Sequence, residues 1–142
     1  MKAAEARALA RTLAEELGAN PRVQLVYVFG SAADPDAAEV RDLDLAIGGA
    51  PSFSREELLA MAARLGSTTG ITLDLVPLER APVVLAHEIA NHGTCLLARP
   101  SEAETSFVLR ARDAYWDFKP LLEQQWRLAG ARQEARLRGP QA

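Results

Sequence analysis

The sequence has few of the features that mark disulfide-stabilised, disordered or membrane-spanning chains. Cys95 is the single cysteine among 142 residues, so no disulfide can form within the chain, and a reducing, cytoplasmic compartment is predicted. No apolar run approaches the roughly 20 residues that cross a bilayer, and no apolar leader segment follows Met1. Aromatic residues make up only 6%, yet 49% of the chain is hydrophobic and 25% is charged, the balance of a folded protein. We therefore predict one compact domain that does not associate with membranes.

The net charge of −3 is divided unevenly along the chain. Residues 127–142 carry four arginines and one glutamate, or +3, which leaves −6 on residues 1–126. An acidic body repels a phosphate backbone, so direct nucleic-acid binding is not expected. We predict a folded domain over residues 1–126 and a basic, flexible tail over residues 127–142, which faces solvent or contacts an acidic partner.

Hydrophobic periodicity and turn residues predict alternating helices and strands. The predicted helices span residues 2–17, 54–65 and 82–92, with a long final helix from residue 101, and the predicted strands span residues 22–29, 42–47, 71–77 and 94–98. The final helix places a set of apolar residues on one face, and these are Phe107, Ala111, Ala114, Phe118 and Leu121. Pro120 is expected to kink or interrupt it. The pattern predicts an α/β (α+β) fold with a small mixed sheet flanked by helices.

Three aspartates alternate with leucines on two of the predicted strands. Asp42 and Asp44 point to the same face of their strand, since side chains two apart share a face. Asp74 lies between two leucines in an equivalent pattern, so the three acids converge if the two strands are neighbours. Close carboxylates repel one another unless a cation neutralises them, and Mg²⁺ prefers such oxygen ligands. The pattern predicts a magnesium site suited to phosphoryl transfer with two metal ions.

A Gly30-Ser31 turn follows the first predicted strand. Glycine lets the backbone approach a triphosphate closely. Backbone N–H groups and the serine hydroxyl can then donate hydrogen bonds to phosphate oxygens. The turn is therefore the predicted nucleotide-binding segment.

Together these motifs resemble the DNA-polymerase-β-like nucleotidyltransferase superfamily. Its signature is an apolar residue followed by Gly-Ser or Gly-Gly, a spacer of about a dozen residues, Asp-x-Asp/Glu and a later lone Asp. Here ten residues separate Ser31 from Asp42. The short chain and long final helix are similar to the minimal nucleotidyltransferase (MNT) group. The resemblance implies that Gly30 and Ser31 bind the nucleotide phosphates, that Asp42 and Asp44 ligate two Mg²⁺ ions, and that Asp74 completes the metal site and helps to activate the incoming hydroxyl.

The same resemblance implies a partner and a reaction. Members of the MNT group are typically encoded beside a helical HEPT/HEPN-type RNase toxin. In the best understood pairs, the MNT protein is an antitoxin that transfers AMP from ATP to a tyrosine of the toxin. A homo-oligomer, or a hetero-oligomer with that partner, is compatible with such an activity.

One departure keeps two other functions open. Many minimal members continue the Gly-Ser turn with Ala-Arg-Gly, whereas this chain has Asp34-Pro35 in place of the Arg-Gly pair. A cation that could neutralise the triphosphate is missing, and Arg41 is the nearest candidate to replace it. The alternatives are a weak or inactive module that neutralises its partner by occlusion, and a nucleotidyltransferase acting on a small molecule such as an aminoglycoside.

The remaining residues whose side chains could bind a metal, react or contact a partner are interpreted as structural or surface residues. His87 and His92 are five residues apart on one predicted helix, so they do not form a zinc pair. Cys95 has no neighbour that favours a thiolate and is predicted to be a buried apolar residue. Trp116 and Trp126 on the final helix are predicted to face the core or a partner.

Overall fold

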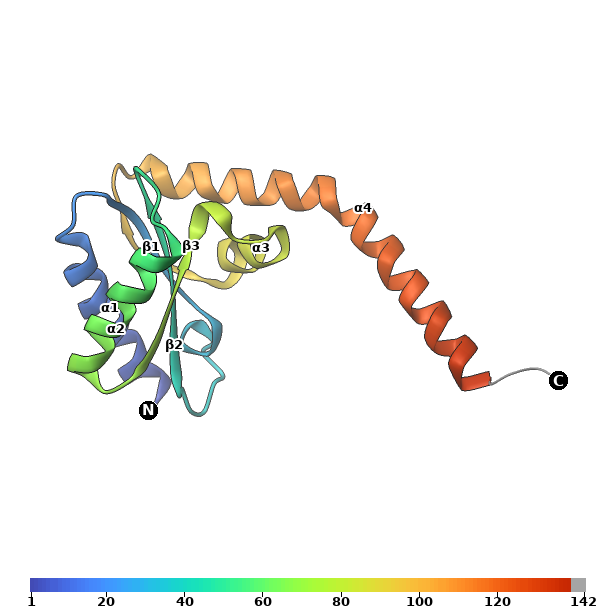
Figure 1. The fold of residues 1–142 in the computed structure, drawn as a ribbon, viewed down its shortest axis with the longest axis horizontal. Helices are drawn as coiled ribbons and strands as arrows, with labels where there is room; N and C mark the ends of the chain where they lie inside the picture. The colour runs from blue at the N-terminus through green and yellow to red at the C-terminus, as the bar shows by residue number, and fades with distance from the viewer. Residues whose placement is uncertain (139–142) are drawn as a thin grey trace.

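Four strands form one mixed sheet in the computed structural model, which describes residues 1–138 (Figure 1). Their spatial order is β3-β2-β1-β4, and their bounds are Val23–Phe29 (β1), Asp42–Gly49 (β2), Thr72–Pro77 (β3) and Thr94–Ala98 (β4). β2 pairs in parallel with β3, while β1 pairs antiparallel with both β2 and β4. The β-branched and aromatic run of β1 forms a buried central strand. The predicted strands and the mixed sheet are confirmed.

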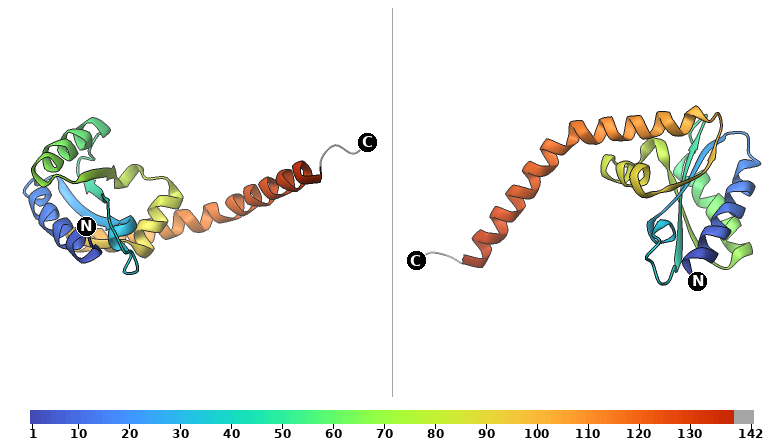
Figure 2. Two further views of the ribbon diagram at one scale, coloured as in Figure 1. Left: turned by 90° about the horizontal axis from the view of Figure 1, so that it is seen from below. Right: turned by 180° about the vertical axis from the view of Figure 1, so that it is seen from behind.

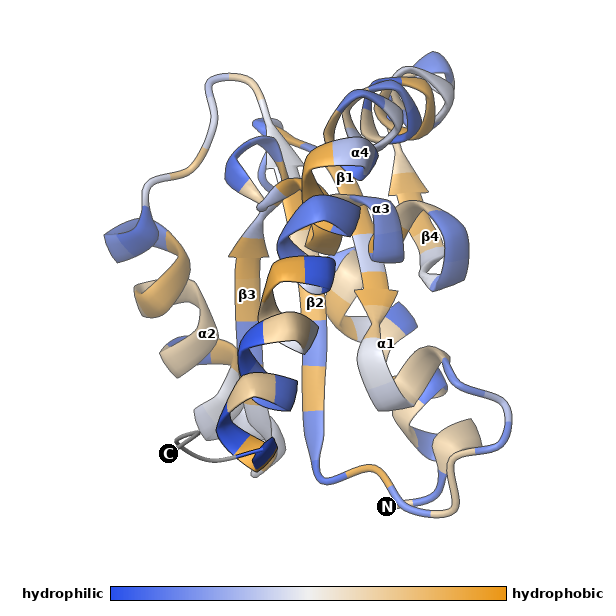
Figure 3. Cartoon of the chain, turned by 90° about the vertical axis from the view of Figure 1, so that its right-hand side faces the viewer, coloured by the Kyte–Doolittle hydropathy of each residue, from blue (hydrophilic) through white to orange (hydrophobic). Residues whose placement is uncertain are grey.

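Helices cover both faces of this sheet. One face packs against α1 (Ala3–Gly18) and α2 (Arg55–Thr69), and the other packs against α3 (Val83–His92) and the first half of α4 (Glu102–Arg138) (Figures 1 and 2). Short 3₁₀ helices follow two of the strands, η1 (Gly30–Ala33) after β1 and η2 (Leu78–Arg80) after β3. Apolar residues concentrate on the strands (Figure 3). The sheet therefore separates two hydrophobic clusters.

The boundaries of α2 have local causes. The Ser54 side chain accepts a hydrogen bond from the Glu57 backbone N–H, and the Glu57 carboxylate accepts one from the Ser54 backbone N–H. The helix continues past the predicted end at residue 65 as far as Thr69. Gly70 ends it, because its φ of 71° is left-handed and its N–H bonds back to the Gly66 carbonyl.

Helix α4 is 37 residues long and extends far from the domain body (Figures 1 and 2). It bends midway and contains Pro120, which cannot donate the helical hydrogen bond at that position. The helix is therefore kinked but not interrupted. Of the apolar face predicted for it, Phe107 and Ala111 are buried and Phe118 is half-buried, whereas Ala114 and Leu121 are exposed.

The segment predicted to be a separate tail is helical as far as the structure describes it. Residues 127–138 form the last turns of α4, so the helix does not end at the predicted boundary at residue 126; residues 139–142 of that segment lie outside the described residues. The division of the chain at residue 126 stays a prediction. Within residues 1–138, no helix is both long enough and apolar enough to cross a membrane.

Candidate active site

The turn after β1 brings the backbone against a carboxylate. Gly30 begins η1 with a φ of 71°, a left-handed conformation that side chains with a Cβ rarely adopt. A Cβ at this position would lie 2.6 Å from Oδ2 of Asp44. Glycine is thus required both by the turn and by the close approach of Asp44.

The strand pattern places the three predicted aspartates on one face. Leu43 and Leu45 are fully buried against the α1 and α2 side of the sheet. Asp42 and Asp44 alternate with them and so point to the other side. In the parallel pairing of β2 with β3, Asp44 lies beside Asp74. In the antiparallel pairing with β1, Asp44 lies beside the last residue before Gly30. Asp44 is therefore flanked by Asp74 on one side and by the Gly-Ser turn on the other.

The electrostatics of Asp44 reflect this position. The pKa of its carboxyl is raised, first because the side chain is half-buried and then because Asp74 and Asp42 add negative charge nearby. Asp42 and Asp74 are exposed. The charged form of Asp44 is thus disfavoured in the folded chain, and a nearby cation would stabilise that form.

The oxygen donors fit magnesium in type, although they do not form a closed ligand set. Across residues 1–138, no three His, Cys, Asp or Glu side chains lie close enough together to hold a metal ion. Asp42, Asp44 and Asp74 share a face and provide hard carboxylate oxygens on neighbouring strands, which are ligands that Mg²⁺ prefers. Their chemistry suits the ion, and their side chains would have to turn towards one another to bind it. The assignment of these three residues as ligands stays a prediction.

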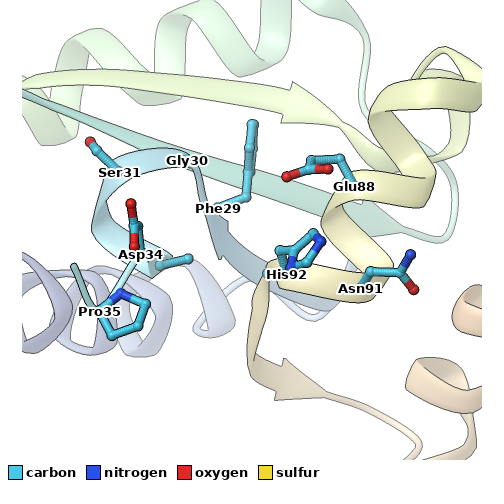
Figure 4. A pocket seen from close by; sticks show the side chains of 10 residues that line it. Phe29, Gly30, Ser31, Asp34, Pro35, Glu88, Asn91 and His92 are labelled. Carbon is cyan, nitrogen blue, oxygen red and sulfur yellow. The ribbon is translucent and has the colours of Figure 1, made fainter. Parts of the chain in front are cut away.

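A cavity of about 590 Å³ opens beside the Gly-Ser turn (Figure 4). One wall is the turn and the loop after it, with Phe29, Gly30, Ser31, Ala33, Asp34 and Pro35. The opposite wall is the C-terminal end of α3, with Glu88, Asn91, His92 and Gly93. Its size is within the range of small-molecule sites, so the two predicted nucleotide-binding residues line a cavity large enough for part of a nucleotide.

Sequence reasoning missed the α3 wall of this cavity. Glu88 and Asn91 were not singled out, and His92 was interpreted as structural or as a surface residue. The wall forms because β4 follows α3 directly and pairs with β1, with Thr94 beside Val28. That pairing joins segments far apart in the sequence, and no motif in α3 indicates it.

The departure from the family motif lies in the same cavity. Asp34 lines it, and its Oδ1 accepts a hydrogen bond from the Asp36 backbone N–H at 2.9 Å, which forms a tight turn. The lining residues all belong to the described part of the chain, and none of them is a lysine or arginine. Arg41 is exposed beside Asp42. The cavity beside the Gly-Ser turn is therefore lined by two acidic side chains, Asp34 from the loop after the turn and Glu88 from the opposite wall.

His87 and Cys95 take part in packing, whereas Trp116 and Trp126 are exposed. The His87 ring of α3 stacks on the Tyr115 ring of α4, with centroids 3.6 Å apart, and so joins the two helices. Cys95 is half-buried, and burial, together with the negative charge of Glu104, raises the pKa of its thiol to about 11. A protonated thiol of this kind is a poor nucleophile. These positions support the fold around the site.

Comparison with known proteins identifies the family. The sequence pattern of the family described as "Polymerase beta, Nucleotidyltransferase" matches residues 11–102. "Protein adenylyltransferase MntA" of Shewanella oneidensis is 29% identical over 84 residues, which are 59% of this chain and 60% of that protein. The alignment thus spans less than two thirds of that relative's length.

Solved structures show the same fold. A toxin–antitoxin structure with AMP-PNP matches with a TM-score of 0.72 and 23% identity, over 85% of this chain and 97% of the other. A tri-AMPylated Shewanella oneidensis HEPN toxin in complex with MNT antitoxin matches with a TM-score of 0.68 and 23% identity, over 87% and 96%. The matched segment contains the Gly-Ser turn and all three aspartates. The chain belongs to the polymerase-β nucleotidyltransferase family.

Proposed function

We propose that this chain is a Mg²⁺-dependent adenylyltransferase that transfers AMP from ATP to a tyrosine of a HEPT/HEPN-type RNase toxin, and that it acts as the antitoxin of that toxin. The similarity to MntA and to a complex that contains an AMPylated toxin supports the acceptor. The similarity to a complex with AMP-PNP supports ATP as the donor. ATP as a substrate also fits the cytoplasmic location predicted from the sequence.

The observation that carries the proposal is the arrangement around Asp44. Asp44 has Asp74 as its neighbour in β3 and contacts the Gly30 turn on its other side. A group transfer needs its donor, its acceptor and its charge-neutralising groups in one place. Here the carboxylates and the Gly-Ser turn lie at the same end of the sheet, because Asp44 is beside Asp74 in β3 and beside Phe29, the last residue of β1.

Each residue has a role in this reaction. The backbone N–H groups after Gly30 and the Ser31 hydroxyl donate hydrogen bonds to phosphate oxygens and orient the triphosphate. The phenolic oxygen of the acceptor tyrosine attacks the α-phosphorus and forms a new P–O bond. The bond to the bridging oxygen breaks, and pyrophosphate leaves with its electron pair. In this proposal the Asp74 carboxylate helps to remove the phenolic proton.

Asp42 and Asp44 would hold Mg²⁺ in this arrangement, with Asp74 completing the set. The ions, when bound, neutralise the triphosphate and stabilise the attacking and leaving oxygens. A second protein would bring the acceptor tyrosine to the Asp44 end of the sheet.

The experiment combines the chain, ATP, Mg²⁺ and the HEPN-type toxin encoded beside it, and measures the mass of the toxin. We expect a gain of one or more AMP groups on a tyrosine, and at least about a 100-fold slower gain with Asp44→Asn. Asp113→Asn, which alters an exposed aspartate on α4, is the matched control and should react like the wild type. An unchanged rate in Asp44→Asn would contradict the proposed site. Chelation of Mg²⁺ should also release bound ATP.

The acidic cavity favours a second candidate, neutralisation of the partner by occlusion without catalysis. Asp34 occupies the position at which many minimal members carry an arginine, and Glu88 lines the same cavity. Both carboxylates repel a triphosphate. This function predicts that the RNase activity of the toxin is inhibited equally by the wild type without ATP and by Asp44→Asn, with no mass gain. Transfer of AMP to an aminoglycoside in the absence of a partner would instead support the small-molecule function.

A further inference from the structure

The distal arm of α4, defined as residues 121–138, exposes large apolar side chains. The exposed fractions are 49% for Leu121, 62% for Trp126, 51% for Leu128 and 82% for Leu137. The arm projects away from the sheet in every view (Figures 1 and 2). At helical spacing Trp126 and Leu137 lie on one side of the arm, and Leu121 and Leu128 lie on the other. Trp126 is the largest exposed apolar side chain of the arm, and tryptophan is a common anchor of protein interfaces. Most helical stability in proteins comes from tertiary packing of an apolar face, so a partner surface would stabilise the arm.

The charge of the arm limits what covers it. The arm carries four arginines and two glutamates, or +2, whereas residues 1–120 carry 12 basic and 17 acidic residues, or −5. Two arms packed side by side would bring their arginines together, and like charges repel. An arm lying on the body of a second copy joins opposite charges instead.

The body also offers an apolar cavity that lies away from the candidate active site. Its volume is about 390 Å³, and it lies between the start of β1, the end of β2, η2, α3 and the first half of α4. Its walls include Leu25, Leu78, Val83, Ala86 and Phe107, and Glu79 and Arg110 are its charged lining residues. An apolar cavity of this kind suits a large aromatic side chain, which is the usual anchor of a protein interface.

We propose that this chain forms a two-fold dimer in which the distal arm of each copy lies on the acidic body of the other and inserts Trp126 into this cavity. The indole enters the apolar part of the cavity, and the neighbouring arginines of the arm lie near acidic side chains of the body, including Glu79. The cavity is at the Leu25 and Gly48 end of the sheet, opposite the Asp44 end, so the dimer leaves the candidate active site open. The proposal does not depend on the proposed reaction.

The first test measures the mass of the full chain in solution by light scattering and ultracentrifugation over a dilution series. The wild type should be dimeric at high concentration, and Trp126→Glu should weaken the dimer at least about 30-fold. Trp116→Glu is the matched control, because Trp116 is also exposed on the same helix, at 73% against 62% for Trp126, but lies outside the distal arm. It should dimerise like the wild type. A wild-type chain that is monomeric at all concentrations would overturn the proposal, even if the arm binds a different protein.

The second test examines the cavity. Ala86→Trp should fill it and weaken the dimer as strongly as Trp126→Glu does, while circular dichroism checks that the variant folds. In a Trp116→Phe background, Trp126 is the remaining tryptophan, and its emission should shift to the blue as the dimer forms, since the indole leaves water. A dimer whose Trp126 emission does not shift would contradict insertion into the cavity. Added salt should weaken the dimer, because opposite charges contribute to it.

Discussion

Gly30 is the residue at which the turn and the carboxylates meet. Its left-handed φ and the 2.6 Å approach of its missing Cβ to Asp44 are separate constraints. Gly70 has the same φ of 71°, but a Cβ there would have no atom within 4 Å. The two glycines therefore allow the backbone requirement to be separated from the contact with the carboxylate.

We predict that Gly30→Ala and Gly70→Ala each cost about 1 kcal/mol of stability, the usual cost of a left-handed backbone with a Cβ. Gly30→Ala should also weaken ATP binding in the presence of Mg²⁺ at least about 10-fold, because the methyl group displaces the Asp44 carboxylate. Gly70→Ala should bind ATP like the wild type. Urea unfolding and titration with a fluorescent ATP analogue measure the two effects. Equal ATP affinity of both variants would show that the approach to Asp44 has no role in binding.

For single residues, the sequence predicts the site only where a rule of local geometry applies, such as the alternation of side chains along a strand. Alternation with buried leucines predicts the shared face of Asp42, Asp44 and Asp74, since the rule needs only strand geometry. The cavity residues Glu88 and Asn91 could not be predicted, because they reach the turn through a long-range strand pairing. The roles of the three aspartates in binding a metal stay a prediction.

Among the helices and strands, the start of α2 is held against the sheet by contacts of Arg22. Its guanidinium donates hydrogen bonds to the Pro51 and Ser52 carbonyls, pairs with the Glu57 carboxylate and lies 4.2 Å from the centre of the Phe53 ring. The capping box of α2 uses the same Glu57 carboxylate. The Arg22 side chain therefore connects the cap of α2 with the start of β1.

This double use of Glu57 predicts a pH dependence of stability. Hydrogen bonds first from Arg22 and then from the Ser54 backbone lower the pKa of Glu57 from 4.5 to about 2. Because the folded chain holds the carboxylate in its charged form, its contribution is complete above about pH 4.5 and is lost as the pH falls towards 2. The difference in unfolding free energy between the wild type and Glu57→Gln should shrink over that range. Glu56→Gln, exposed on the same turn, should show no such trend.

Helices and strands were predictable where intrinsic propensity, the hydrophobic pattern and capping residues indicate the same structure. The Ser54 cap and the β-branched run of β1 both predict the observed structure. The length of α4 was not predicted, because four arginines suggested a solvated tail although arginine, alanine, glutamine and leucine are good helix formers. Burial along α4 was overestimated for Leu121, since periodicity predicts a face but does not reveal where the body ends.

For the whole molecule, the domain body and the end of α4 are expected to be energetically separate. The residues of α4 after 126 are exposed and belong to neither hydrophobic cluster. A chain ending at residue 126 should therefore keep the unfolding free energy of the full chain within about 0.5 kcal/mol. Urea unfolding should be measured at concentrations at which both chains are monomeric, since association would add stability. A larger loss would mean that the last turns of α4 support the body and that the predicted boundary is wrong.

The parallel pairing of β2 with β3 also imposes a rule on how this chain can change in length. Moving β3 by one position relative to β2 would exchange every outward side chain with its inward neighbour, so a leucine would occupy the place of Asp74. The connection through α2 can gain or lose residues as long as the same side chains of β3 continue to point to each face of the sheet. Homologues with insertions between these strands should accordingly differ in helix or loop length while each keeps an acid opposite Asp44.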